Sequence, residues 1–119
     1  MEWKLTDDRP IWFQLAEQMT RRIITGAYPP GSKLPTVREL AAEAGVNPNT
    51  MQRALAQLEQ DGLTRADRTA GRLVTQDTAV LDAIRRDSAR EIIHQYFAAM
   101  AELDYTKAQA AAVLMEEEK

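Results

Sequence analysis

The chain has 119 residues, 45% of them hydrophobic, which is enough for one folded domain with a modest core, or for one small domain with an appendage. It has no cysteine and one histidine, so a disulfide framework, a thiolate metal site and a site built from several histidines are excluded. The net charge of −3 argues against a protein that coats nucleic acid non-specifically. We find no signal peptide and no apolar run near the length of a membrane span, so we expect a cytoplasmic protein without a membrane partner.

The charges are unevenly distributed along the chain. Up to residue 77, ten lysines and arginines are matched by ten acidic residues, whereas residues 78–119 hold five against eight. The negative excess therefore lies in the C-terminal part, and the N-terminal part can still present a basic face.

The first elements are an arm and a scaffold helix. Residues 1–9 form either an arm that attaches to the surface through Trp3 or a disordered tail. A helix is predicted from Pro10 to about Thr25, because a proline stands at its start and a glycine follows its end. Its expected buried stripe consists of Phe13, Ala16, Met19, Ile23 and Ile24. The prolines and glycine of residues 27–33 predict a turn.

Two short helices joined by a tight turn follow. Thr36 can cap the first, with Glu39 three residues later completing a capping box, and Gly45 ends it. Asn47 can cap the second and Pro48 takes its first position. The apolar positions of the two helices are Leu40, Ala41, Ala44, Met51, Ala54, Leu55 and Leu58. This spacing is typical of a helix-turn-helix, and equally of a helical hairpin in a small bundle.

The residues after Gly62 favour the first interpretation. Leu63–Arg65 and Arg72–Thr75 are predicted as two short strands around the polar loop ADRTAG. A helix-turn-helix followed by a small β-hairpin is typical of a winged helix.

Two further helices are predicted at the C-terminal end. One runs from about Thr78 to Leu103, and the other covers residues 107–118 with Thr106 and Gln109 as a capping box. This appendage of about 42 residues is too small to enclose an effector pocket of a few hundred Å³ by itself. We expect it to form a dimer as a four-helix bundle. The expected interface residues are Leu81, Ile84, Ile92, Tyr96, Phe97 and Met100.

The chain resembles the DNA-binding domain of the GntR family of bacterial transcriptional repressors. The resemblance is carried by the stretch GAYPPGSKLPTVRELAAEAGVNPNTMQRALAQLEQDGL and by AGRLV, which follows it. The resemblance covers about residues 10–76, and the short helical extension is similar to that of the YtrA branch. It implies a mainly α fold with a small β-hairpin. The implied domains are an arm (1–9), a winged helix-turn-helix that binds DNA (10–77) and a helical dimerisation hairpin (78–119).

The resemblance also implies DNA contacts on the two motif helices. Arg38 stands where the family has an arginine that contacts DNA. Side chains at the start of the second helix can reach phosphates or base edges. The candidates there are Asn47, Asn49, Thr50, Gln52 and Arg53. Asn47 is expected to use its side chain on the helix cap. The family often has arginine at the positions of Pro48 and Gln52, so this chain departs from the family pattern at both.

The wing supplies Arg68, Thr69, Gly71 and Arg72 as further candidates, in a basic stretch whose glycine allows close approach to the DNA backbone. The common family wing is G-x-G-T-x-V. Here Thr69 replaces the first glycine, Gly71 keeps the second and Arg72 replaces the threonine, and we expect backbone or minor-groove contact.

The resulting hypothesis is a homodimeric repressor that binds a palindromic double-stranded DNA operator, with transporter genes as targets by analogy to the YtrA branch. We expect no catalytic residue, cofactor or metal, and His94 is expected at an interface or on the surface. An alternative is a winged-helix module for protein interaction, as in antitoxins. A fragment of an aminotransferase-like enzyme would need a lysine-bearing domain that the chain lacks. A small-molecule effector, if one exists, would bind between protomers or between hairpin and winged helix.

Overall fold

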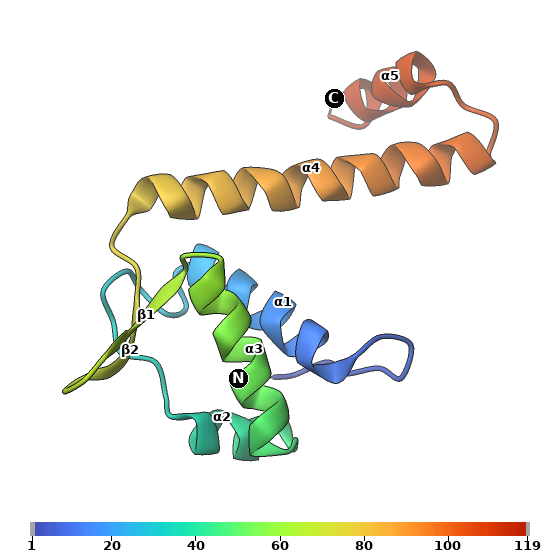
Figure 1. Cartoon of the computed structure of the whole chain (residues 1–119). Helices are drawn as coiled ribbons and strands as arrows, with labels where there is room; N and C mark the ends of the chain where they lie inside the picture. The colour runs from blue at the N-terminus through green and yellow to red at the C-terminus, as the bar shows by residue number, and fades with distance from the viewer. Residues whose placement is uncertain (1, 119) are drawn as a thin grey trace. The chain divides into compact units, whose positions relative to one another are not determined.

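The computed structural model describes residues 2–118. Within this range the chain forms a two-stranded sheet and helices in the order α1 (Ile11–Ile24), α2 (Val37–Ala44), α3 (Pro48–Gln60), β1 (Thr64–Asp67), β2 (Gly71–Val74), α4 (Thr78–Glu102) and α5 (Lys107–Glu117) (Figure 1). It divides into two compact units between Asp82 and Ala83. The predicted fold class, a winged helix followed by helices, is confirmed.

Local signals set the ends of α2 and α3 as predicted. The Thr36 hydroxyl accepts a hydrogen bond from the backbone N–H of Glu39, whose carboxylate accepts one from the N–H of Thr36. Gly45 ends α2 in the left-handed region, with φ of 71°, which glycine adopts without steric cost. Asn47 caps α3, and Pro48 is its first residue.

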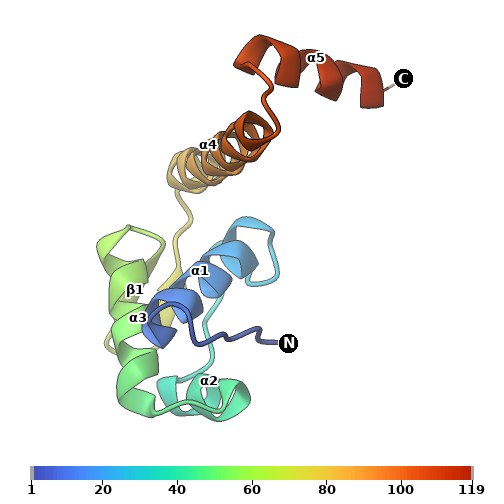
Figure 2. The ribbon, with the colours of Figure 1, turned by 90° about the vertical axis from the view of Figure 1, so that its right-hand side faces the viewer.

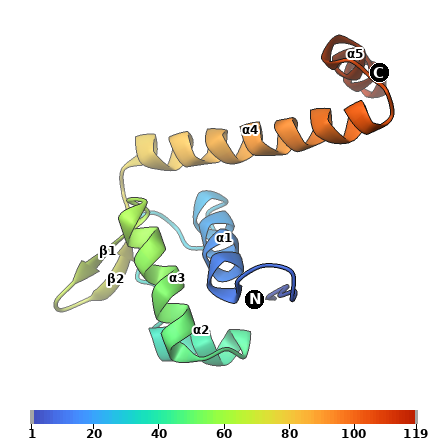
Figure 3. The same ribbon diagram turned by 45° about the vertical axis from the view of Figure 1, so that its right-hand side comes forward.

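The core of the first unit lies between α1, α2 and α3, which cross one another beside the hairpin (Figures 1 and 3). Its large buried side chains include Leu15, Met19, Ile23, Leu34, Leu40, Met51, Leu55, Leu58, Leu63 and Val74. Phe13 is a correction, because 43% of it is exposed. It precedes the buried Met19 by six residues, which sets the two side chains about 120° apart around the helix.

The N-terminal arm packs against the first unit, so the attached alternative holds for its described residues. The backbone of Lys4 exchanges two hydrogen bonds with the side-chain amide of Gln18, at 2.9 and 2.7 Å. The Trp3 indole N–H donates to Glu43 at 2.9 Å, and the buried Arg22 guanidinium lies over the Trp3 ring, 3.9 Å from its centroid. The arm therefore links α1 to α2.

The wing is an antiparallel hairpin whose register pairs Thr64 with Val74 and Asp67 with Gly71. The strands extend further into the loop than predicted, and Leu63 and Thr75 fall outside them. The other edge of β2 is also paired: the N–H of Leu34 donates to the carbonyl of Arg72, and that of Val74 to the carbonyl of Ser32, each at 2.9 Å. Residues 32–34 therefore pair with β2 and hold the base of the wing.

In the C-terminal helices, Thr106 and Gln109 form the predicted capping box at the start of α5. The Tyr96 hydroxyl donates to the carbonyl of Ala110 at 2.7 Å, and Ala110 is buried. Figure 2, which views α4 nearly end-on, shows α5 lying across the end of α4. No helix within residues 2–118 combines the length and hydrophobicity needed to cross a membrane.

Candidate nucleic-acid interface

The exposed face of α3 carries the central candidates. Asn49, Gln52 and Arg53 are exposed, and Thr50 is half-buried. Residues three or four positions apart share one face of a helix, so the first three side chains point away from the core together. The opposite face is buried in the core through Met51, Ala54, Leu55 and Leu58. The helix thus presents polar groups that can enter a major groove.

The turn before α3 uses part of this polar set. The side-chain oxygen of Asn47 accepts a hydrogen bond from the backbone N–H of Asn49 at 2.7 Å. That oxygen is therefore committed to the helix cap, as the sequence predicts. The amide nitrogen of Asn47 is the part of the side chain that can still act as a donor.

Arg38 is the second residue of α2 and is exposed. Among the residues that the structure describes, its guanidinium has no hydrogen bond or ion pair, so its donors are available to a phosphate or a base. Arg53 is held differently: its guanidinium lies over the ring of Trp12 from α1, 4.3 Å from the ring centroid.

The tip of the wing is organised by Asp67. One oxygen of its carboxylate accepts hydrogen bonds from the backbone N–H groups of Ala70 and Thr69 and from the Thr69 hydroxyl, each at 2.9 Å. These bonds lower the pKa of Asp67 to about 2, and the bond from Ala70 makes the largest contribution. The nearby charge of Arg65 lowers the pKa further. The Thr69 hydroxyl hydrogen is thus used within the turn, whereas the neighbouring Arg68 is exposed.

Gly71 and Arg72 lie at the start of β2. Gly71 has φ of +88°, and a Cβ at this position would approach Cε of Lys33 to 3.3 Å. Arg72 is half-buried, and its Nη1 is inaccessible with no hydrogen-bond partner among residues 2–118. Arg72 is therefore less free than Arg38 to meet DNA without a change of rotamer.

Two residues near this surface are not among the DNA contacts predicted from the sequence. Lys33 is exposed and pairs through its backbone with Leu73, which puts its side chain beside Gly71 of the wing. Trp12 is half-buried and supports Arg53. The turn composition around Lys33 and the aromatic pair at the start of α1 were the available signals, but neither indicates a partner in the sequence.

The apolar face of α4 and α5 is the second candidate surface. Ile92 is 66% exposed, Leu103 68% and Met115 62%. Of the expected interface residues, Ile84, Tyr96, Phe97 and Met100 are half-buried, whereas Leu81 is already buried in its own chain and has little area left for a partner. His94 is exposed on α4. Within residues 2–118, no group of His, Asp and Glu side chains is arranged to hold a metal ion.

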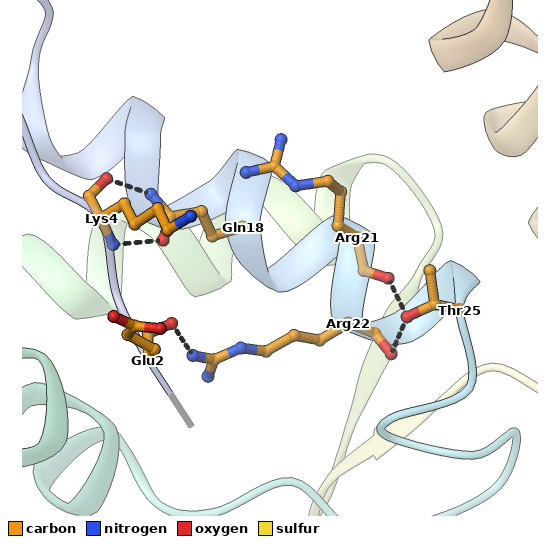
Figure 4. A pocket seen from close by; sticks show the side chains of 6 residues that line it. All are labelled: Glu2, Lys4, Gln18, Arg21, Arg22 and Thr25. Carbon is orange, nitrogen blue, oxygen red and sulfur yellow. Dashed lines mark hydrogen bonds between the residues drawn. The ribbon is translucent and has the colours of Figure 1, made fainter.

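A polar cleft of about 310 Å³ lies between the arm and α1 (Figure 4). It is lined by Glu2, Lys4, Gln18, Arg21, Arg22 and Thr25. Arg22 donates to the carbonyl of Glu2 at 3.0 Å and forms an ion pair with Glu43 at 3.3 Å, so its charge is committed to the attachment of the arm. The effector site expected between protomers involves surfaces beyond a single chain and stays a prediction.

Known proteins share this arrangement. Residues 13–74 match the model of the family described as bacterial regulatory proteins, gntR family. The HTH-type transcriptional regulator YhcF of Bacillus subtilis is 33% identical over 107 residues, which are 90% of this chain and 88% of YhcF. The HTH-type transcriptional repressor YtrA of the same organism is 38% identical over 68 residues, which are 57% of this chain and 52% of YtrA.

Two solved structures extend the comparison. A GntR family transcriptional regulator from Listeria monocytogenes superposes with a TM-score of 0.85 at 32% identity, covering 94% of this chain and 98% of that one. The DNA-binding domain of AraR, solved in complex with operator ORX1, gives a TM-score of 0.58 at 26% identity over 63% of this chain and 96% of that one. The likeness to the Listeria regulator therefore includes both the winged helix and the C-terminal helices, whereas the AraR domain matches a smaller part of this chain.

Proposed function

The chain belongs to the gntR family of bacterial regulatory proteins, and on this premise we propose that it is a homodimeric repressor of a palindromic operator. Membership makes it a DNA-binding transcriptional regulator and not an enzyme. The observation that carries the proposal is the exposed polar face of α3, together with the exposed Arg38 near the start of α2.

Each candidate has a role that its chemistry supports. Gln52 can read an adenine through two hydrogen bonds, and Asn49 can do the same from the first turn of α3. Arg38, Arg53 and the wing arginines carry charges for backbone phosphates. The AraR domain, of the same fold, binds an operator in its crystal structure, which supports assigning the equivalent surface here to DNA.

The dimer is proposed from the C-terminal helices. Ile92, Leu103 and Met115 are large apolar side chains that leave more than half of their surface exposed in the single chain. Large apolar side chains left exposed in the single chain favour association. Two copies of α4 and α5 would cover these faces as a four-helix bundle. A symmetric dimer matches a palindromic operator, because each protomer reads one half-site.

Repression and targets are proposed by analogy. YtrA carries the name of a repressor, and the match to it supports the same sign of regulation here. Control of transporter genes rests on the likeness to the YtrA branch alone. A regulator of bacterial genes acts where the chromosome lies, so we place the protein in the cytoplasm.

The test is selection of bound sequences from random DNA, followed by sedimentation of the protein with the selected duplex. We expect an inverted repeat with half-sites about one helical turn apart and two chains per duplex. A single unrepeated motif with one chain bound would reject the dimeric mode, and no enrichment would reject sequence-specific binding. Transcription in vitro from a promoter that carries the site should fall on addition of the protein; a rise would make it an activator.

A further inference from the structure

The contact between Trp12 and Arg53 joins the scaffold helix to the recognition helix. The Arg53 Cζ lies 4.3 Å from the centroid of the indole ring, and Arg53 is exposed on the outward face of α3. Trp12 is half-buried, and the Phe13 ring meets it edge-on at 5.8 Å and 89°. Among residues 2–118 the Arg53 guanidinium has no hydrogen bond or ion pair besides this ring contact.

Stacking uses the face of a guanidinium and leaves the N–H donors along its edge free. A long arginine side chain loses rotamer freedom when it binds, and a side chain that is already held loses less. The core contacts of α3 are made by Met51, Ala54, Leu55 and Leu58 on the other face, so the packing of α3 does not require the Arg53 guanidinium. The contact is therefore better explained by what it does for Arg53.

We propose that Trp12 is a positioning residue for DNA recognition: its indole holds the Arg53 guanidinium in place to contact a backbone phosphate of the operator. The inference rests on the proposed function and extends it to α1, which contributes no other candidate to the interface. A phosphate fits because the free edge presents several donors to an anion, and because phosphate contacts fix the register of a recognition helix in the groove.

The experiment is a double-mutant cycle in the full chain, with Trp12→Leu, Arg53→Ala and the double variant titrated against the selected operator at several salt concentrations. Arg53→Ala should weaken binding and reduce the slope of log affinity against log salt by about one per protomer. Trp12→Leu should weaken binding about two- to fivefold per protomer in the wild-type background. It should have no further effect when Arg53 is already alanine.

Two conservative variants separate positioning from a structural role. Trp12→Phe retains an aromatic face and should recover most of the affinity lost in Trp12→Leu, whereas Arg53→Lys retains the charge without the planar group and should recover only part. If Trp12→Leu weakens binding equally in both backgrounds, Trp12 supports the fold alone and the proposal is overturned. If neither Trp12 variant changes affinity, it is overturned as well.

A measurement on the wild type guards against variants that do not fold. In the free protein, the Arg53 Nε–H proton should resonate upfield because of the indole ring current, and this shift should persist in the operator complex. Loss of the ring-current shift on binding would show that Arg53 leaves Trp12, which overturns the proposal while DNA binding stands. Failure of the wild type itself to bind any selected DNA would instead reject the proposed function.

Discussion

The two units of the chain complete their apolar faces differently. In the first, the large apolar side chains of α1, α2 and α3 meet one another, and Leu55 and Leu40 are fully buried. In the second, Ile92 on α4, Leu103 just after α4 and Met115 on α5 remain exposed in the single chain. An apolar side chain in a predicted helix is thus expected to be buried, but the sequence does not indicate whether its own chain or a partner will cover it. The winged helix carries its own core, whereas the C-terminal helices present a face suited to a partner.

The largest effect is expected from a substitution in the second unit. Ile92→Glu should dissociate the proposed dimer at micromolar concentration, because burying an unpaired charge at the interface costs several kcal/mol. Operator binding should fall with it, since two linked half-sites are lost. Light scattering measures the mass directly.

The matched control for this change is His94→Glu. Position 94 is two residues further on, about 200° around the helix, so the same charge is introduced on the opposite side. His94→Glu should remain a dimer. A dimeric Ile92→Glu would show that the interface has been assigned to the wrong face.

A second pair of variants compares burial within one chain with burial between chains. Leu55→Ala leaves a cavity in the core and should lower the free energy of unfolding by about 2–5 kcal/mol at every protein concentration. Leu103→Ala removes a side chain that is exposed in the monomer, so its effect should depend on protein concentration. Urea denaturation at two protein concentrations distinguishes the two variants. An equally large loss for Leu103→Ala in a monomeric sample would contradict the comparison.

What the sequence could predict follows the same division. The capping box of Thr36 and Glu39 and the cap of Asn47 depend on residues a few positions apart, and both were predicted. The stacking of Arg53 on Trp12 was not, because it joins helices that are distant in the sequence and needs their packing to exist first. The apolar character of Phe13 predicts that it is buried, whereas its angle around α1 turns it towards solvent.

DNA contacts should be confined to the first region and differ in kind. Arg38→Ala should lower the slope of log affinity against log salt by about one per protomer. Gln52→Ala should instead relax discrimination among sequences by about 1–3 kcal/mol if its contact is bidentate. Titrations at several salt concentrations, on matched and altered operators, measure both.

Arg86→Ala is the control from the second region, since it removes an equal charge from an exposed position of α4. It should leave both the salt slope and the sequence preference unchanged. A reduced slope for Arg86→Ala would extend the DNA surface onto α4, and unchanged binding for both Arg38→Ala and Gln52→Ala would remove it from α2 and α3.

The smallest effect concerns the wing, which depends on a polar turn. The pKa of Asp67 is lowered to about 2 in the folded chain by the hydrogen bonds from Ala70 and Thr69, against an ordinary value of 3.8. Because the folded pKa is the lower one, the stabilising contribution is complete above about pH 4 and is lost as pH falls towards 2. The amide resonances of Thr69 and Ala70 should therefore stay constant from pH 7 to about pH 4 and change below it. Asp67→Asn should keep these bonds in weaker form and abolish the transition. If the midpoint of this pH transition in the wild type lies at or above 3.8, the ordinary pKa, the Asp67 carboxylate does not hold the turn.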